Sequence, residues 1–284
     1  MRARAVAALK AEHRLEVLLK VSGLARSTFF YHQARLELPD PRAALKADIT
    51  RLFEANKGRY GHRRIHGRLL AQGHKVAKKT VLKLMGRLGL ACQVRRRRSY
   101  SSYRGQAGEV APNLLERDFT ARGPNRKWVT DVTEFAVAGR KVYLSPVMDL
   151  FDRQVISYTA GLSPNLELTN ASLREALETL APGQRPLVHS DQGFQYQHMS
   201  WRRLLAGAGC IQSMSRKGNC LDNAVIESFF GHLKEEFFTH AEFDCVEEFT
   251  AGLDEYIAWF NHERVHSYLE GLSPVQYRAQ ALAA

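Results

Sequence analysis

Three carboxylates in the second half of the chain have the residue type and the surroundings of metal ligands. Asp131 lies in an apolar, strand-like stretch, Asp191 follows a short apolar stretch, and Glu227 lies among apolar helical residues. An ionised carboxylate in such surroundings is costly unless a cation compensates its charge. Carboxylate oxygens are preferred by Mg²⁺ and Mn²⁺, and two such ions about 4 Å apart can assist both oxygens of a phosphoryl transfer. The three residues together predict such a site, whereas each alone could be a cap or an ion-pair residue.

The elements that must position these carboxylates alternate along the chain. Stretches rich in β-branched and aromatic residues predict five strands, at 128–135, 141–148, 154–158, 186–189 and 210–213. Helical spacing of apolar residues predicts helices at 166–180, 201–208 and 223–238. This order predicts an α/β fold with a mixed sheet covered by helices. Asp131 is then expected in the middle of the first strand, and Asp191 at the carboxyl end of the fourth, where open sheets place ligands.

The first part of the chain predicts an all-helical unit. Apolar spacing places helices at 45–57, about 63–72 and about 78–88, with glycines after the second and third. Helix, glycine turn and helix is the layout of a helix–turn–helix. The outer face of the third helix carries four basic residues that suit a major groove: Lys78, Lys79, Lys83 and Arg87. A three-helix bundle with a solvated basic face is the alternative, since periodicity does not separate the two.

Charge is segregated along the chain. The net charge is +12, but residues 1–110 carry +18 and residues 111–284 carry −6. A basic arm of this kind neutralises phosphates and releases counterions; a merely basic, soluble surface is the alternative. Segment 92–124 is expected to be a basic linker, and a basic loop occurs near residue 216. The residues expected to bind DNA in these two segments are Arg95, Arg96, Arg97, Arg98, Arg216 and Lys217.

Several classes of protein are disfavoured by composition. No stretch of about 18 uncharged apolar residues predicts a membrane span, and the N-terminus lacks the apolar core of a secretory signal. The four cysteines form no C-x-x-C pair, so reduced thiols are expected. A cytoplasmic protein is the simplest interpretation.

The spacing and context of the carboxylates resemble those of retroviral integrases and insertion-sequence transposases, and in particular the insertion-sequence-three family. Thirty-five residues separate Asp191 from Glu227. The similarity covers roughly residues 15–280, and the combination is specific where any one motif is weak. The motifs that carry it are Trp128–Asp131, Val147–Arg153, His189–Gly193, Asp222–Glu227 followed by Lys234, Tyr60–Ile65, and Asn261–Ser267 with Leu272–Pro274.

This resemblance implies a ribonuclease-H-like catalytic core that uses Mg²⁺ or Mn²⁺, with two ions when DNA is bound. It implies cleavage at the element's ends to free a 3′-hydroxyl, followed by attack of that hydroxyl on target DNA. It also implies a homo-oligomer on nucleoid DNA and a chain encoded by the second of two reading frames, with an upstream-frame protein as fusion or partner. The expected domains are 1–44 (helical), 45–92 (helix–turn–helix), 93–124 (flexible linker), 125–240 (catalytic core) and 241–284 (helical tail).

Other residues are expected to support the carboxylates. Asn223, Glu227 and Lys234 fall on one helix face. Lys234 is expected to hold a DNA phosphate, the alternative being an exposed ion pair with an adjacent glutamate. Asn223 is expected to orient Glu227 or the scissile strand, the alternative being a helix cap. His189 and Gln192 are further supporting candidates. A nuclease that only hydrolyses DNA, and a catalytically silent DNA-binding regulator, are the alternative functions.

Overall fold

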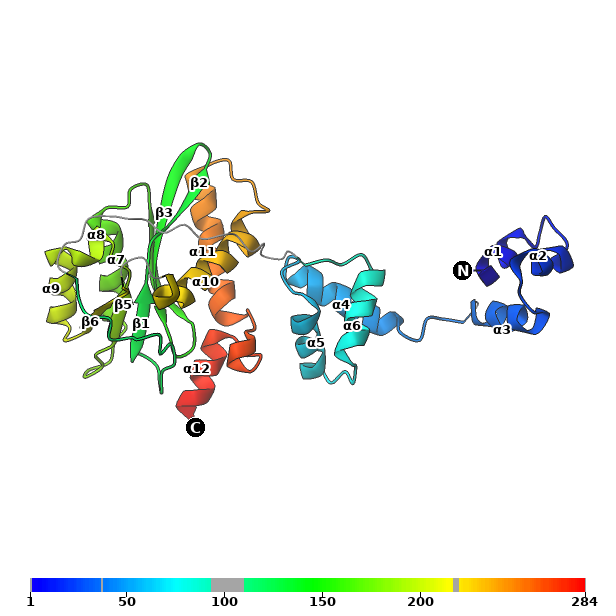
Figure 1. Cartoon of the computed structure of the whole chain (residues 1–284), viewed down its shortest axis with the longest axis horizontal. Coiled ribbons are helices and arrows are strands. Elements are labelled where there is room, and N and C mark those ends of the chain that lie inside the picture. Colours follow the sequence, from blue (N-terminus) through cyan, green and yellow to red (C-terminus); the bar gives the residue numbers. More distant parts are fainter. Residues whose placement is uncertain (1, 37, 93–109, 217–219, 284) are drawn as a thin grey trace. The chain divides into compact units, whose positions relative to one another are not determined.

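The computed structural model describes residues 2–36, 38–92, 110–216 and 220–283. The chain forms two compact units, Met1–Cys92 and Gln93–Ala284 (Figure 1). Five residues expected to bind DNA lie outside the described residues: Arg95, Arg96, Arg97, Arg98 and Lys217. In the parts of the chain that the structure covers, no helix is long and apolar enough to cross a membrane.

The first unit is entirely helical within its described residues. Its helices are α1 (Arg2–Leu9), α2 (Leu15–Ser22), α3 (Arg26–Leu36), α4 (Ala43–Ala55), α5 (His62–Ala71) and α6 (Lys78–Arg87). The last three match the predicted helices within two residues. They bury apolar side chains at helical spacing, among them Ile49, Ile65 and Val81. Gly73, with φ of 86°, supplies the left-handed backbone conformation after α5 that other residues rarely adopt.

The second unit is built on a mixed sheet. Its strands are β1 (Lys127–Thr130), β2 (Thr133–Val137), β3 (Arg140–Asp149), β4 (Val155–Gly161), β5 (Leu187–Ser190) and β6 (Ile211–Met214). The order is β2-β3-β1-β5-β6, and β4 pairs with β3. β5 runs parallel to β1 and β6, whereas the pairings of β3 are antiparallel. The predicted α/β class and mixed sheet are confirmed.

The sheet has six described strands rather than the predicted five because the first predicted strand is interrupted. Thr130 pairs with Val147 and Thr133 with Leu144, so β1 and β2 follow one register along β3. That register places Pro146 opposite Asp131. The amide of Leu150 donates to the carbonyl of Lys127 at 2.9 Å. Hydrogen-bonded pairs in an antiparallel ladder recur at every second residue, so Asp131 and Pro146 occupy such a pair. Because proline has no N–H, the ladder hydrogen bond to Asp131 is missing. Asp131 therefore lies in the interruption and not in mid-strand.

Helices cover both faces of this sheet (Figure 1). On one face lie α7 (Leu166–Glu178), α8 (Phe194–Gln197) and α9 (Met199–Gly207), packed on Trp128 and Val147. On the other lie α10 (Ala224–Leu233), a π-helical turn (Lys234–Phe238) and α11 (Val246–His262), packed on Val129 and Met148. Neighbouring residues such as Trp128 and Val129 belong to different cores because successive side chains of a strand point to opposite faces of the sheet. The last helix is α12 (Pro274–Ala283).

Residues 110–124 differ from the flexible linker expected at 93–124. Leu115 is 1% exposed and belongs to the core beneath α10 and α11. Asn113 Nδ2 donates to Asp222 Oδ2 (3.0 Å), and Arg117 Nε donates to Asp222 Oδ1 (2.8 Å). These contacts, which composition does not reveal, make the segment part of the second unit.

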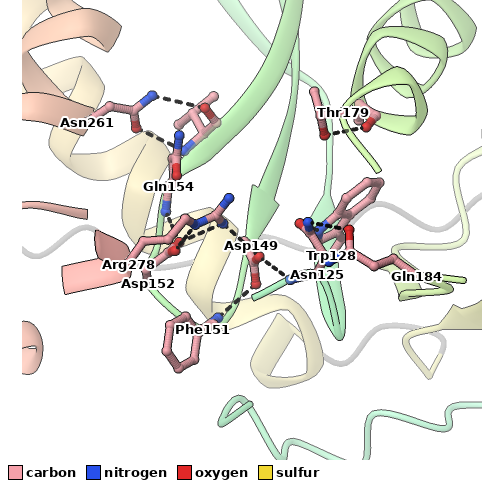
Figure 2. A network of polar contacts seen from close by, with 12 residues as sticks. Asn125, Trp128, Asp149, Phe151, Asp152, Gln154, Thr179, Gln184, Asn261 and Arg278 are labelled. Carbon is pink, nitrogen blue, oxygen red and sulfur yellow. Dashed lines mark hydrogen bonds and ion pairs between the residues drawn. The ribbon is translucent and has the colours of Figure 1, made fainter. Parts of the chain in front are cut away.

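The Val147–Arg153 motif anchors the last helix. Arg278 of α12 reaches both Asp149, at the end of β3, and Asp152 (Figure 2). Its Nη2 lies 2.8 Å from Asp149 Oδ2. Asp149 also accepts the amides of Asn125 (2.7 Å) and Phe151 (2.9 Å). Burial, together with the charge of Asp152, raises the pKa of Asp149 to about 6. One arginine thus stabilises two buried carboxylates.

This raised pKa predicts a measurable pH dependence of stability. The folded chain holds the Asp149 proton more tightly than the unfolded chain, where the pKa is near 3.8. The stabilisation is therefore complete below about pH 4 and is lost as the pH rises through about 6. Relative to Asp149→Asn, the wild type should lose on the order of 2 kcal/mol of unfolding free energy between about pH 4 and pH 7. Urea unfolding followed by tryptophan fluorescence measures this; a difference that stays constant with pH would contradict it.

Candidate active site

Asp131 lies at the centre of the candidate site. It is partly buried, and its Oδ1 accepts the amide of Val132 at 2.7 Å. Burial raises the pKa of Asp131 well above its usual range, and the charges of Asp191 and Glu227 raise it further, whereas Lys234 opposes the shift. The structure thus brings Asp191 and Glu227 within electrostatic reach of Asp131.

Asp191 follows β5 directly, as predicted. Because Val129 pairs with His189 in parallel strands, Asp131 and Asp191 each lie two residues beyond a paired position, at the same edge of the sheet. Asp191 Oδ1 accepts the amide of Gly193 at 2.9 Å. A Cβ at Gly193 would lie 3.0 Å from that oxygen, so a side chain there would crowd the carboxylate. Burial raises the pKa of Asp191 as well.

Glu227 lies in the first turn of α10, and Asn223 joins the start of this helix to β1. Asn223 is 3% exposed, and its Nδ2 lies 3.5 Å from the carbonyl oxygen of Thr130, the residue before Asp131. Asn223 makes no side-chain capping bond. The structure therefore favours a positioning contact over the alternative of a helix cap.

Lys234 begins the π-helical turn that follows α10. Its Nζ lies 5.4 Å from the centre of the Phe135 ring, and its charge lowers the pKa of Asp131. The glutamates proposed as alternative partners are bound elsewhere: Glu235 Oε1 lies 3.2 Å from His240 Nε2, and Glu236 is paired with Arg264. The charge of Lys234 thus acts on Asp131, although the predicted regular helix contains a π-helical turn at this point.

Relatives of known class match nearly the whole chain. InsK of insertion sequence element IS150 from Escherichia coli K12 is 47% identical over 272 residues, which is 96% of each chain. The transposase InsF for insertion sequence IS3A from the same organism is 34% identical, covering 96% of this chain and 97% of the relative. The chain belongs to the DDE transposases of the insertion-sequence-three family. A relative from IS1353 of Shigella flexneri is 40% identical, and this transposase spans 54% of its length.

Family models place the same features in order along the transposase. An HTH-like domain matches residues 40–98, and integrase core domains match 121–220 and 227–282. Among solved structures, the HTLV-2 integrase catalytic core domain in complex with magnesium has 18% identity and a TM-score of 0.44. That match covers 55% of this chain and 98% of the viral chain.

Glu236 and Arg264 form a buried ion pair that the sequence analysis missed. Arg264 is 1% exposed; its Nη2 lies 2.7 Å from Glu236 Oε1 and its Nε 2.8 Å from Oε2. The hydroxyl of Tyr256 donates to Glu236 Oε2 at 3.0 Å. The pair ties the π-helical turn of Lys234 to the segment after α11. Arg264 lies in the Asn261–Ser267 motif, which is visible in the sequence, but the motif does not indicate that Glu236 is the partner of this arginine.

Arg216 has a partner within the transposase, although its side chain is 61% exposed and its contact with DNA stays a prediction. Its Nε lies 2.9 Å from Asp222 Oδ2 and its Nη2 3.0 Å from Oδ1. Asp222 is fully buried, and Arg216, with the help of Arg117, holds its pKa well below the usual range. The buried aspartate thereby fastens three segments together, five residues before Glu227.

The two supporting candidates near Asp191 link neighbouring segments. His189 Nδ1 lies 2.9 Å from Ser213 Oγ, and burial lowers the pKa of His189 to about 4 against the opposing charge of Asp222. His189 is therefore neutral at neutral pH and does not add a cation. Gln192 Nε2 donates to the carbonyl of Ser215 at 2.9 Å. Both residues join the end of β5 to β6.

The donor set of the site fits a hard divalent cation. Three carboxylates supply oxygen ligands of the kind that such ions prefer. Burial first, and then the charges of Asp191 and Glu227, raise the pKa of Asp131, and Lys234 opposes this shift only in part. Across the described ranges, no three His, Cys, Asp or Glu side chains are gathered as a complete metal site.

Proposed function

We propose that Asp131, Asp191 and Glu227 are the metal-binding catalytic residues of this transposase. The chain is a polynucleotidyl transferase of the DDE type, which cleaves DNA and transfers a strand. Family membership supports dependence on a divalent metal, and we propose two Mg²⁺ or Mn²⁺ ions when DNA is bound. The observation that carries this proposal is that the charges of Asp191, at the edge shared by β1 and β5, and of Glu227, on α10, both raise the pKa of Asp131.

The neighbouring residues have separate tasks in the proposed mechanism. Bound divalent ions would supply charge neutralisation and activation of the attacking hydroxyl. In joining, the element's 3′-oxygen bonds to a target phosphorus, and the bond from that phosphorus to the target's own 3′-oxygen breaks. Lys234 binds a DNA phosphate beside the carboxylates. Asn223 keeps the start of α10 against β1, which positions Glu227.

We propose that DNA binding is shared between the second unit and the helix–turn–helix of residues 45–92. The match of an HTH-like domain supports this proposal. All four basic residues predicted on the third helix are exposed on α6: Lys78, Lys79, Lys83 and Arg87. A helix with such a face suits a major groove and gains affinity from phosphate neutralisation.

The partners of the transposase follow from the same proposal. The two ends of an element have to be held close together for cutting and joining, so a homo-oligomer assembled on nucleoid DNA is proposed. The IS1353 relative is nearly twice as long as this chain. That length supports a protein from an upstream frame, as fusion or partner, contributing to binding of the ends.

Joining of a labelled end duplex to a plasmid tests the proposed function. The duplex carries the element's terminal repeat, and products are resolved with Mg²⁺, with Mn²⁺ and with chelator. Joined products that require the metal are expected. Metal-dependent cutting without joining, with the upstream-frame protein present, would instead support the hydrolytic nuclease.

A further inference from the structure

The first three helices form a small unit with a core of its own. Each helix contributes one buried apolar side chain: Val6 from α1 (3% exposed), Leu19 from α2 (8%) and Phe29 from α3 (0%). α1 packs against both α2 and α3. The family models described above begin at residue 40, after these helices. From the sequence, this segment was predicted only to be helical.

The connection between α2 and α3 is a tight three-residue turn, Gly23–Ala25. Gly23 has φ of 67°, and its amide donates to the carbonyl of Leu19. The amide of Leu24 donates to the same carbonyl at 3.2 Å. A first helix that covers two others, joined by a short turn with a left-handed glycine, is the layout of a helix–turn–helix.

The outward face of α3 is polar and cationic. Phe29 is the one buried side chain among those described for this helix, and the exposed residues include Arg26, Ser27, Thr28, Tyr31, His32 and Arg35. The guanidinium of Arg35 lies 4.5 Å from the centre of the Tyr31 ring. That of Arg26 lies 5.5 Å from the Phe30 ring. These contacts hold both cations against the helix surface, which reduces the side-chain entropy lost on binding.

The charge of this segment complements a phosphate backbone. Residues 1–36 contain seven Arg and Lys and two Glu, and neither glutamate lies in α3. The exposed aliphatic side chains Val17 (56%) and Val21 (83%) lie on α2, whereas the exposed Phe30 (42%) of α3 is covered by the guanidinium of Arg26. A protein partner would be expected to use α2, whereas α3 has the composition of a surface that reads DNA.

We propose that α2 and α3 form a second helix–turn–helix, and that α3 lies in the major groove of the element's terminal DNA. This inference rests on the proposed function, because it assumes that the transposase binds its own ends. Two helix–turn–helix segments, ending in α3 and α6, then contact two separate segments of each end. Arg35 and Tyr31 contact base edges or phosphates of the DNA segment in which α3 lies.

Footprinting of the full chain on a terminal-repeat duplex, without divalent metal, tests this inference. Tyr31→Ala/Arg35→Ala removes two side chains from the exposed face of α3, and Lys83→Ala removes one from α6. Lys10→Ala is the matched control, since it removes one exposed positive charge from the same three-helix segment. The double variant is expected to lose protection over about 10 base pairs, one helical turn, and to bind about ten-fold more weakly. Lys83→Ala should weaken a different segment, and Lys10→Ala should keep both.

The outcomes separate this inference from the proposed function. Circular dichroism first establishes that each variant is folded, and its footprint is then compared with that of the wild type. A double variant with the wild-type footprint overturns the inference and leaves the proposed function intact. A changed sedimentation coefficient with an unchanged footprint also overturns it, because α3 would then contact protein. A wild-type chain that protects no terminal segment, with the upstream-frame protein supplied, overturns both.

Discussion

Glu227→Gln is expected to abolish strand transfer while preserving DNA binding. The amide keeps the shape of the side chain but removes the charge that a divalent ion requires. Joining should fall by at least about a thousandfold, which corresponds to about 4 kcal/mol of lost transition-state stabilisation. Electrophoresis of labelled end duplexes measures joining, and a mobility shift on the same duplexes measures binding.

The matched control for this prediction is Glu247→Gln. Glu247 is exposed in the first turn of α11, so it also lies near a helix N-terminus, but outside the site. Its replacement should leave joining unchanged. Full joining by Glu227→Gln would show that Glu227 is not a ligand, and equal losses in both variants would indicate a general effect of charge.

Arg264→Met is expected to destabilise the second unit strongly. It leaves the carboxylate of Glu236 buried without its arginine, while the Tyr256 hydroxyl still donates to Oε2 at 3.0 Å and His232 Nδ1 lies 3.7 Å from Oε1. Breaking a buried pair in this way costs about 3–5 kcal/mol. All three tryptophans of the chain lie in the second unit, so urea unfolding followed by their fluorescence reports this cost.

Two further variants show whether charge or packing causes the effect. Arg264→Met/Glu236→Gln removes both charges and should recover most of the loss. Lys141→Met breaks the exposed pair of Lys141 (65% exposed) with Glu134 (54%) and should leave the free energy of unfolding nearly unchanged, because solvent screens such a pair. Equal costs for Arg264→Met and Lys141→Met would contradict a special role for burial. Joining can also be compared at a urea concentration at which the wild type and Arg264→Met/Glu236→Gln are both folded. Weaker joining by this double variant than by the wild type would indicate that the pair also positions Lys234.

Local pattern was sufficient to predict the strands and helices around the site, because each has a clear apolar period. The position of Asp131 was not predicted correctly, since it depends on which residue of β3 lies opposite. Pro146 is visible in the sequence, but only the register shows that its missing N–H interrupts the ladder at the aspartate.

Polar contacts between separate elements and loops were the least predictable part of the site. Arg216 and Asp222 each look like surface residues in their own segments, and nothing in either segment indicates that they meet. Charge alone suggested that Arg216 would contact DNA, whereas its guanidinium forms two short contacts within the chain. Periodicity describes one element at a time, and so it does not report contacts between elements.

The contacts of Asp222 have a mechanical consequence. The segment at 110–117 is the first described part of the chain after the helical unit, and Arg117 fastens it to Asp222. Asp222 lies five residues before Glu227. The same segment is also held to the sheet, because the amide of Met214 in β6 donates to the carbonyl of Pro112 at 3.3 Å. Tension created when the helical unit binds DNA would therefore be shared between β6 and the start of α10, which carries Glu227, the proposed catalytic carboxylate that lies on a helix.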